Sequence, residues 1–170
     1  MSDLPGQSSG TTGAPPGGDQ PGYQQQPPVA YSGDGPSGPR AGFWRRFGAY
    51  FIDAIILGIV QGILGAIFAD NVGIAYLLSI AITWGYFTYF EGGPRGQTVG
   101  KMALSIRVID LKGGGSIGYG RAFVRQLVKI VSGAVLLLGY LWMLWDREKQ
   151  TWHDKAAGSV VVPVDAYPVT

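Results

Sequence analysis

The segment Val72–Phe90 is the strongest constraint on the fold, because its 19 residues include no Asp, Glu, Lys or Arg. A bilayer core of about 30 Å needs roughly 20 apolar residues of helix. Two further apolar segments are long enough: Phe47–Phe68, with Asp53 as its one charge, and Leu127–Trp145, with Lys129. Lys129 lies near the start of its segment, so we expect it to snorkel to the headgroups. We predict an all-α membrane protein with three hydrophobic helical segments.

The chain before these segments has a different composition. Residues 1–39 hold 9 Gly and 8 Pro, and they contain no Lys, Arg, Phe, Trp or Ile. Such a segment buries too little apolar surface to offset an ordering cost of about 1–2 kcal/mol per residue. It also lacks the basic stretch and apolar core of a secretory signal. We predict that residues 1–40 form a disordered Pro/Gly/Gln-rich tail and that residues 41–170 form the transmembrane domain.

The basic residues predict the orientation, because Lys and Arg are enriched in cytoplasmic loops. The link Ala69–Asn71 between the first two segments has none. Basic residues precede the first segment and separate the second from the third: Arg40, Arg45, Arg46, Arg95, Lys101, Arg107, Lys112, Arg121 and Arg125. We predict a multi-pass protein of the cell membrane, with a cytoplasmic N-terminal tail, a cytoplasmic long loop and an external link.

The third hydrophobic segment leaves two alternatives open. If it crosses the membrane, the C-terminal residues 146–170 lie outside. However, Ile106–Asp110 in the long loop and the run that starts at Ser159 both have the composition of strands. These two runs can pair only on the same side of the membrane. Gly133 and Gly139 offer points where the segment could bend back as a re-entrant hairpin, provided that protein covers the bend.

The first segment carries the candidate functional residues. Arg46 and Asp53 are seven residues apart, two helical turns, so they share one helix face. An ionisable residue within a span is costly and usually faces the bundle or water. Asp53 is therefore either a carboxylate that responds to protons or cations, or a structural contact paired to a basic group.

The same helix has a stripe of small residues. Gly58 and Gly62 are four residues apart, a spacing that lets helices approach closely in lipid. We expect them to pack against the second segment or against another copy of the chain. Gln61 lies between them, and we expect it to make an interhelical hydrogen bond.

Several kinds of chemistry are disfavoured. The chain has no Cys and one His, so thiol nucleophiles and sites built from several His or Cys ligands are excluded. The segment Gly92–Lys101 departs from the phosphate-binding loop pattern, because Arg95 stands where a Gly is required. A net charge of +2 gives no sign of a nucleic-acid interface. We expect no enzymatic activity, no cofactor, no metal site and no nucleic-acid partner.

Three sequence blocks together resemble the RDD family of bacterial membrane proteins. They are Phe43–Asp53, Gly96–Asp110 and residues 150–162, and they occur in the family's order. The arginine and the two aspartates that name the family map onto Arg46, Asp53 and Asp154, with Arg45 as a neighbouring alternative for the arginine. The resemblance implies a multi-pass membrane protein. Transport has been proposed for the family, and sodium–proton antiport for some of its members.

The position of Asp154 decides whether these three residues can form one site. If Asp154 is cytoplasmic, it could approach Arg46 and Asp53 as a compact cluster of one arginine between two carboxylates. If the end of the chain is external, Asp154 lies a membrane thickness away. The expected function is ion or small-solute transport by a homo-oligomer or with a membrane partner. The alternative is a membrane-anchored scaffold that recruits partners through its Pro-rich tail.

Overall fold

The computed structural model describes residues 37–135 and 138–168. The tail that the sequence predicts to be disordered lies outside the described residues, apart from its last few positions. The predicted domain from residue 41 onward is described almost in full. It consists of six α-helices, one 3-10 helix and two strands within the described part of the chain.

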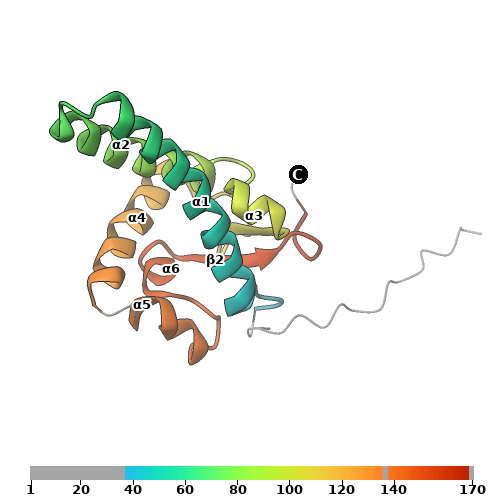
Figure 1. The fold of residues 1–170 in the computed structure, drawn as a ribbon. Helices are drawn as coiled ribbons and strands as arrows, with labels where there is room; N and C mark the ends of the chain where they lie inside the picture. Colours follow the sequence, from blue (N-terminus) through green and yellow to red (C-terminus); the bar gives the residue numbers. More distant parts are fainter. Residues whose placement is uncertain (1–36, 136–137, 169–170) are drawn as a thin grey trace, which may run out of the picture.

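Two long helices form an antiparallel hairpin. Helix α1 spans Phe43–Ile67 and helix α2 spans Val72–Gly92, and both are long and apolar enough to cross a membrane. Figure 1 shows the linked ends of α1 and α2 extending together beyond the other elements. The Gln61 amide donates to the Thr83 hydroxyl at 3.1 Å, which confirms the interhelical hydrogen bond expected for Gln61. Many apolar side chains of the pair are exposed, as side chains that face lipid are, including Ile55, Ile59, Ile63, Tyr76 and Leu77.

A small subdomain, formed by the elements that follow the two long helices, packs at the other end of this hairpin. Helix α3 (Val99–Ala103) leads into strand β1 (Ile106–Asp110), which pairs antiparallel with strand β2 (Ser159–Pro163). Both strand-like runs identified in the sequence are therefore strands. Their buried side chains meet the start of α1 in a core formed by Ala41, Ala49, Ile106, Val108, Ile117, Ala122 and Val161.

The third hydrophobic segment is divided among short elements. Its residues lie in the second half of helix α4 (Gly118–Ala134), in α5 (Leu138–Leu141) and in the 3-10 helix η1 (Trp142–Leu144), and α6 (Trp152–Ala156) follows after the segment. The helix axis bends by 115° between Gly118–Gly133 and Leu138–Leu144. The third segment is therefore not one straight helix, and its bend is that of a broken span or of a re-entrant loop. The mostly helical membrane fold is confirmed, with a two-stranded sheet added to it.

The small-residue stripe of α1, Gly58 and Gly62, has no close neighbour in the described part of the chain. A Cβ atom added at Gly58 or at Gly62 would meet nothing within 4 Å among the described residues. The first of the two expected partners, helix α2, therefore does not pack against these glycines. The second, another copy of the chain, stays a prediction.

Candidate functional site

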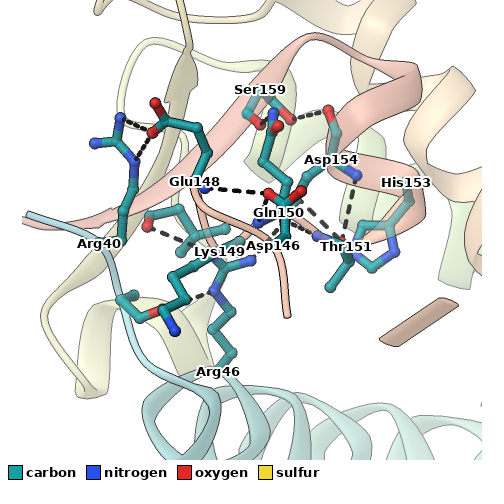
Figure 2. Close-up of polar contacts among 12 residues, drawn as sticks. Arg40, Arg46, Asp146, Glu148, Lys149, Gln150, Thr151, His153, Asp154 and Ser159 are labelled. Carbon is teal, nitrogen blue, oxygen red and sulfur yellow. Dashed lines mark hydrogen bonds and ion pairs between the residues drawn. The ribbon is translucent and has the colours of Figure 1, made fainter. Parts of the chain in front are cut away.

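Arg46 and Asp154 form an ion pair where the first turn of α1 meets α6. The Arg46 guanidinium donates to Asp154 Oδ2 at 2.5 Å. It also donates to the carbonyl oxygens of Lys149 at 2.8 Å and Ala41 at 3.1 Å. Figure 2 shows Arg46 reaching from α1 toward the segment that carries Lys149. Arg45 instead donates to the Leu104 carbonyl, so of these two adjacent arginines it is Arg46 that pairs with an aspartate.

The local sequence before Asp154 fixes the direction of its carboxylate. Thr151 is the N-cap of α6, and its hydroxyl accepts from the Asp154 N–H. The Asp154 carboxylate accepts in return from the Thr151 N–H at 3.1 Å, which completes a capping box. A short helix of five residues is thereby held so that its fully buried acid faces α1 and α4.

Arg125 links Asp154 to a second buried acid. Its Nη1 donates to Asp154 Oδ1 and to the Ser159 hydroxyl, and its Nε donates to Glu91 Oε2 at 3.0 Å. The other oxygen of Glu91 accepts from Lys101 at 2.5 Å and from Lys129 at 2.8 Å. One continuous ionic cluster results, made of Arg46, Asp154, Arg125, Glu91, Lys101 and Lys129.

Sequence reasoning missed four members of this cluster. Lys129 was expected to snorkel, and this expectation is wrong, because its ammonium binds the Glu91 carboxylate instead. Arg125 and Lys129 are four residues apart, which places both on the buried face of α4. The sequence signal for this cluster was that four-residue spacing together with Glu91, an acid directly after the uncharged run of α2.

The cluster keeps Asp154 ionised. Burial alone would raise the pKa of this carboxyl, but the guanidinium groups of Arg125 and Arg46 lower it well below its ordinary value of 3.8. A carboxyl whose pKa is lower in the folded state stabilises the fold at every pH above its ordinary pKa, and this contribution is lost as the pH falls below that value. Burial also lowers the pKa of His153 far below its usual value, so the neighbouring imidazole is neutral at pH 7.

Asp53 lies in a separate site, and the compact cluster of one arginine between two carboxylates is not formed. The Asp53 carboxylate accepts from the Tyr86 hydroxyl at 2.7 Å, the Thr98 hydroxyl at 2.6 Å and the Gly100 N–H at 2.8 Å. The physical reason is the helix rise, since seven residues separate Asp53 from Arg46 by about 10 Å along α1. At that level α1 meets α2 and α3 rather than α6.

Gly100 explains how α3 approaches the Asp53 site so closely. A Cβ atom at this position would overlap the carbonyl oxygen of Ala49 on α1 and would lie 3.0 Å from the Asp53 carboxyl carbon. Only glycine allows the two backbones to approach this closely without displacement. The N-cap Thr98 then directs its hydroxyl to Asp53. Among the described residues, no three His, Asp or Glu side chains gather in a group that could hold a metal ion.

Two long apolar helices above a polar, ion-paired subdomain define a membrane protein. The chain belongs to the RDD family, because the model of this family matches residues 40–158, which is more than half of the sequence. The resemblance seen in the three sequence blocks is thereby confirmed. The matched range contains Arg46, Asp53 and Asp154, and the structure brings two of these three residues into direct contact.

Several curated bacterial proteins are similar to part of this chain. The proline-rich antigen homolog of Mycobacterium tuberculosis is 35% identical over 92 residues, which cover 54% of this chain and 35% of that protein. The proline-rich antigen of Mycobacterium leprae is 34% identical over 103 residues, 61% of this chain and 39% of that protein. The chain therefore matches little more than a third of these relatives. The uncharacterized protein YxaI of Bacillus subtilis is 29% identical over 67% of this chain and 91% of its own length. No solved structure matches this chain.

Proposed function

We propose that the protein lies in the bacterial plasma membrane with α1 and α2 as its crossings and both chain ends in the cytoplasm. Three observations support this topology. The strands β1 and β2 pair, the last helices return to the start of α1, and the basic residues cluster away from the Asp70–Asn71 link. In this arrangement α4 lies along the inner membrane face, with its cations toward the ionic cluster and with Phe123, Leu127, Ile130 and Val131 exposed.

Cysteine labelling tests this topology cleanly, because the chain has no native Cys. Asp70→Cys lies in the link between α1 and α2, and Asp165→Cys lies after β2 at an exposed position. In intact cells we expect a membrane-impermeant maleimide to label Asp70→Cys and to leave Asp165→Cys unlabelled until the cells are opened. Labelling of Asp165→Cys in intact cells would show that the third segment crosses.

We propose that the activity is transport of a small cation or of protons, with Asp53 as the ion-binding carboxylate. The observation that carries this proposal is the environment of Asp53, which is 1% exposed within an apolar helix. Its partners are two hydroxyl groups and one N–H, and no Lys, Arg or His of the described residues pairs with it. A carboxylate without a fixed counter-ion can exchange a bound cation or a proton, whereas Asp154 is neutralised by two guanidinium groups.

Transport of this kind requires more than one copy of the chain. Two crossing helices do not enclose a path, and the Gly58–Gly62 face of α1 is open to a second helix. We propose a homo-oligomer whose copies meet along this face, which would place Asp53 within one helical turn or two of the contact.

Flux measurements in proteoliposomes test the role of Asp53. In Asp53→Asn the amide oxygen can still accept from Tyr86 and Gly100, so the fold is retained while the charge is lost. We expect sodium or proton flux to fall at least about tenfold, because the change removes the one group proposed to bind the ion. Asp70→Asn, in the exposed link, is the matched control and should transport like the unmodified protein. Equal flux in all three proteins would remove Asp53 from the mechanism, and no flux above protein-free liposomes in any of them would favour the scaffold alternative.

The alternative function is a membrane scaffold that presents the N-terminal tail. One observation favours it: side-chain contacts fix the described end of the tail to the folded domain. The Arg40 guanidinium binds Glu148 at 2.7 Å and the Ser37 hydroxyl donates to the same carboxylate at 2.5 Å (Figure 2 shows the Arg40–Glu148 pair). These contacts tie the start of the folded domain to the segment before α6, so a partner bound to the tail would be held close to the polar subdomain.

A further inference from the structure

A further polar feature lies apart from the ionic cluster and from the Asp53 site. A cleft of about 450 Å³ opens beside strand β1, between the loop that follows this strand, the residues after α2 and the last described residues. It is lined by Pro94, Arg107, Gly114, Gly115, Ser116, Ala166, Tyr167 and Pro168. This lining contains one cation and no carboxylate.

Arg107 is the unusual residue of this cleft. It is 5% exposed, yet its guanidinium binds two neutral acceptors, the carbonyl oxygens of Pro168 at 2.8 Å and Pro94 at 3.0 Å. Its Nε is buried and has no hydrogen-bond partner among residues 37–135 and 138–168. The other two arginines that are as deeply buried, Arg40 and Arg125, each pair with a carboxylate.

A buried cation with no carboxylate partner among the described residues is unusual, because a charge loses its hydration shell on burial. A guanidinium has five N–H groups, and two of those of Arg107 are used in the contacts above. The remaining donors can serve an anion with several oxygen atoms. Arginine is well suited to that task, because its planar fork matches the geometry of carboxylate and phosphate groups.

The glycine-rich loop contributes Gly114, Gly115 and Ser116 to the lining of the cleft. The N–H groups of Gly115 and Ser116 donate to no acceptor among the described residues, and Gly115 carries no side chain to cover them. Asp110, the acid closest to this loop in the sequence, is engaged by Arg121 at 2.8 Å and accepts from the Gly113 N–H. Backbone N–H groups in a turn beside a cation form an anion-binding concavity.

We propose that this cleft binds a phosphate group, held by Arg107 and by the N–H groups of Gly115 and Ser116. Pro94 comes two residues after the end of α2, so in the proposed topology the cleft lies near the headgroups of the inner leaflet. The phosphate could therefore belong to an anionic lipid or to a soluble ion. The phosphate chemistry rests on the cleft alone, and only the lipid source depends on the topology.

Position 115 allows a test that leaves Arg107 in place. A Cβ atom there meets nothing within 4 Å, and the φ angle of Gly115 is not positive, so a side chain can be accommodated. Gly115→Asp adds a negative charge to the cleft, and Gly115→Asn adds a neutral side chain of the same shape. This pair separates charge from bulk without disturbing the contacts that Arg107 makes to Pro94 and Pro168.

The measurement is the melting temperature of the full chain in a neutral detergent, titrated with inorganic phosphate against chloride at equal ionic strength. A second titration uses short-chain phosphatidylglycerol against phosphatidylcholine. For the unmodified protein and Gly115→Asn we expect a saturable rise, and for Gly115→Asp an apparent affinity at least about tenfold weaker, because like charges repel at short range. A response to phosphatidylglycerol alone would assign a lipid, and a response to both would assign the phosphate group itself. No saturable response, or equal responses in the Asp and Asn variants, would overturn the proposal.

Discussion

Replacing Asp154 by asparagine should lower the free energy of unfolding by about 3–5 kcal/mol, the usual cost of removing one partner from a buried ion pair. The change leaves the guanidinium groups of Arg46 and Arg125 buried next to a neutral amide. It also weakens the capping box at the start of α6. We expect a large fall in the melting temperature of the protein in detergent, measured by circular dichroism or by loss of the monodisperse gel-filtration peak.

Asp165→Asn is the matched control for this change. Asp165 is exposed, and it follows β2 rather than entering the ionic cluster. Surface carboxylates of this kind contribute about 0–1 kcal/mol, so the control should melt close to the unmodified protein. The destabilisation by Asp154→Asn should also be similar at pH 5 and pH 8, because the lowered pKa keeps this carboxyl ionised throughout that range. A melting temperature unchanged by Asp154→Asn would mean that the ionic cluster does not hold α6 against α1.

Replacing Gly100 by alanine should destabilise the protein by at least about 3 kcal/mol, at the upper end of the cost of overpacking. The new Cβ atom would overlap a backbone oxygen of α1, and backbone cannot rotate away as a side chain can. Helix α3 must therefore move outward, and the Thr98 hydroxyl and Gly100 N–H move away from Asp53 with it. Thermal unfolding in detergent measures the first effect, and flux in proteoliposomes measures the second.

Gly65→Ala is the corresponding control on α1. A Cβ atom at Gly65 meets nothing within 4 Å, and alanine favours a helix over glycine by about 1 kcal/mol in an exposed helix interior. This variant should be as stable as the unmodified protein or slightly more stable. If both alanine variants melted alike, the close approach of α3 to α1 would not exist in the membrane-embedded protein.

The apolar segments were predictable because hydropathy is a property of consecutive residues in the sequence. The uncharged run Val72–Phe90 lies within α2, whose helix ends two residues later at Gly92. The first segment was expected from Phe47, whereas α1 begins at Phe43 and includes Arg45 and Arg46. A hydropathy pattern indicates which residues can lie within the lipid. A helix can nevertheless extend through charged residues whose side chains have partners, as Arg46 does.

The third segment shows where reading along the chain fails. Leu127–Trp145 has the composition of a span, yet its first residues belong to α4, an amphipathic helix that starts at Gly118. Lys129 has its partner, Glu91, 38 residues earlier in the sequence. Composition cannot tell a helix whose apolar face lies along the membrane, as we propose for α4, from one that crosses the bilayer, because both present the same apolar side chains to lipid.

The sequence by itself determined the class of membrane protein, the two long apolar helices, the two strands and the identity of Arg46, Asp53 and Asp154 as residues to examine. These are properties of local runs and of motifs with specific spacing. Only the tertiary structure decided that Arg46 pairs with Asp154, 108 residues away, and that Asp53 stands apart with Tyr86, Thr98 and Gly100. The physical reason is that an ion pair or hydrogen bond needs its atoms within about 3 Å, and no local pattern encodes which distant elements come that close.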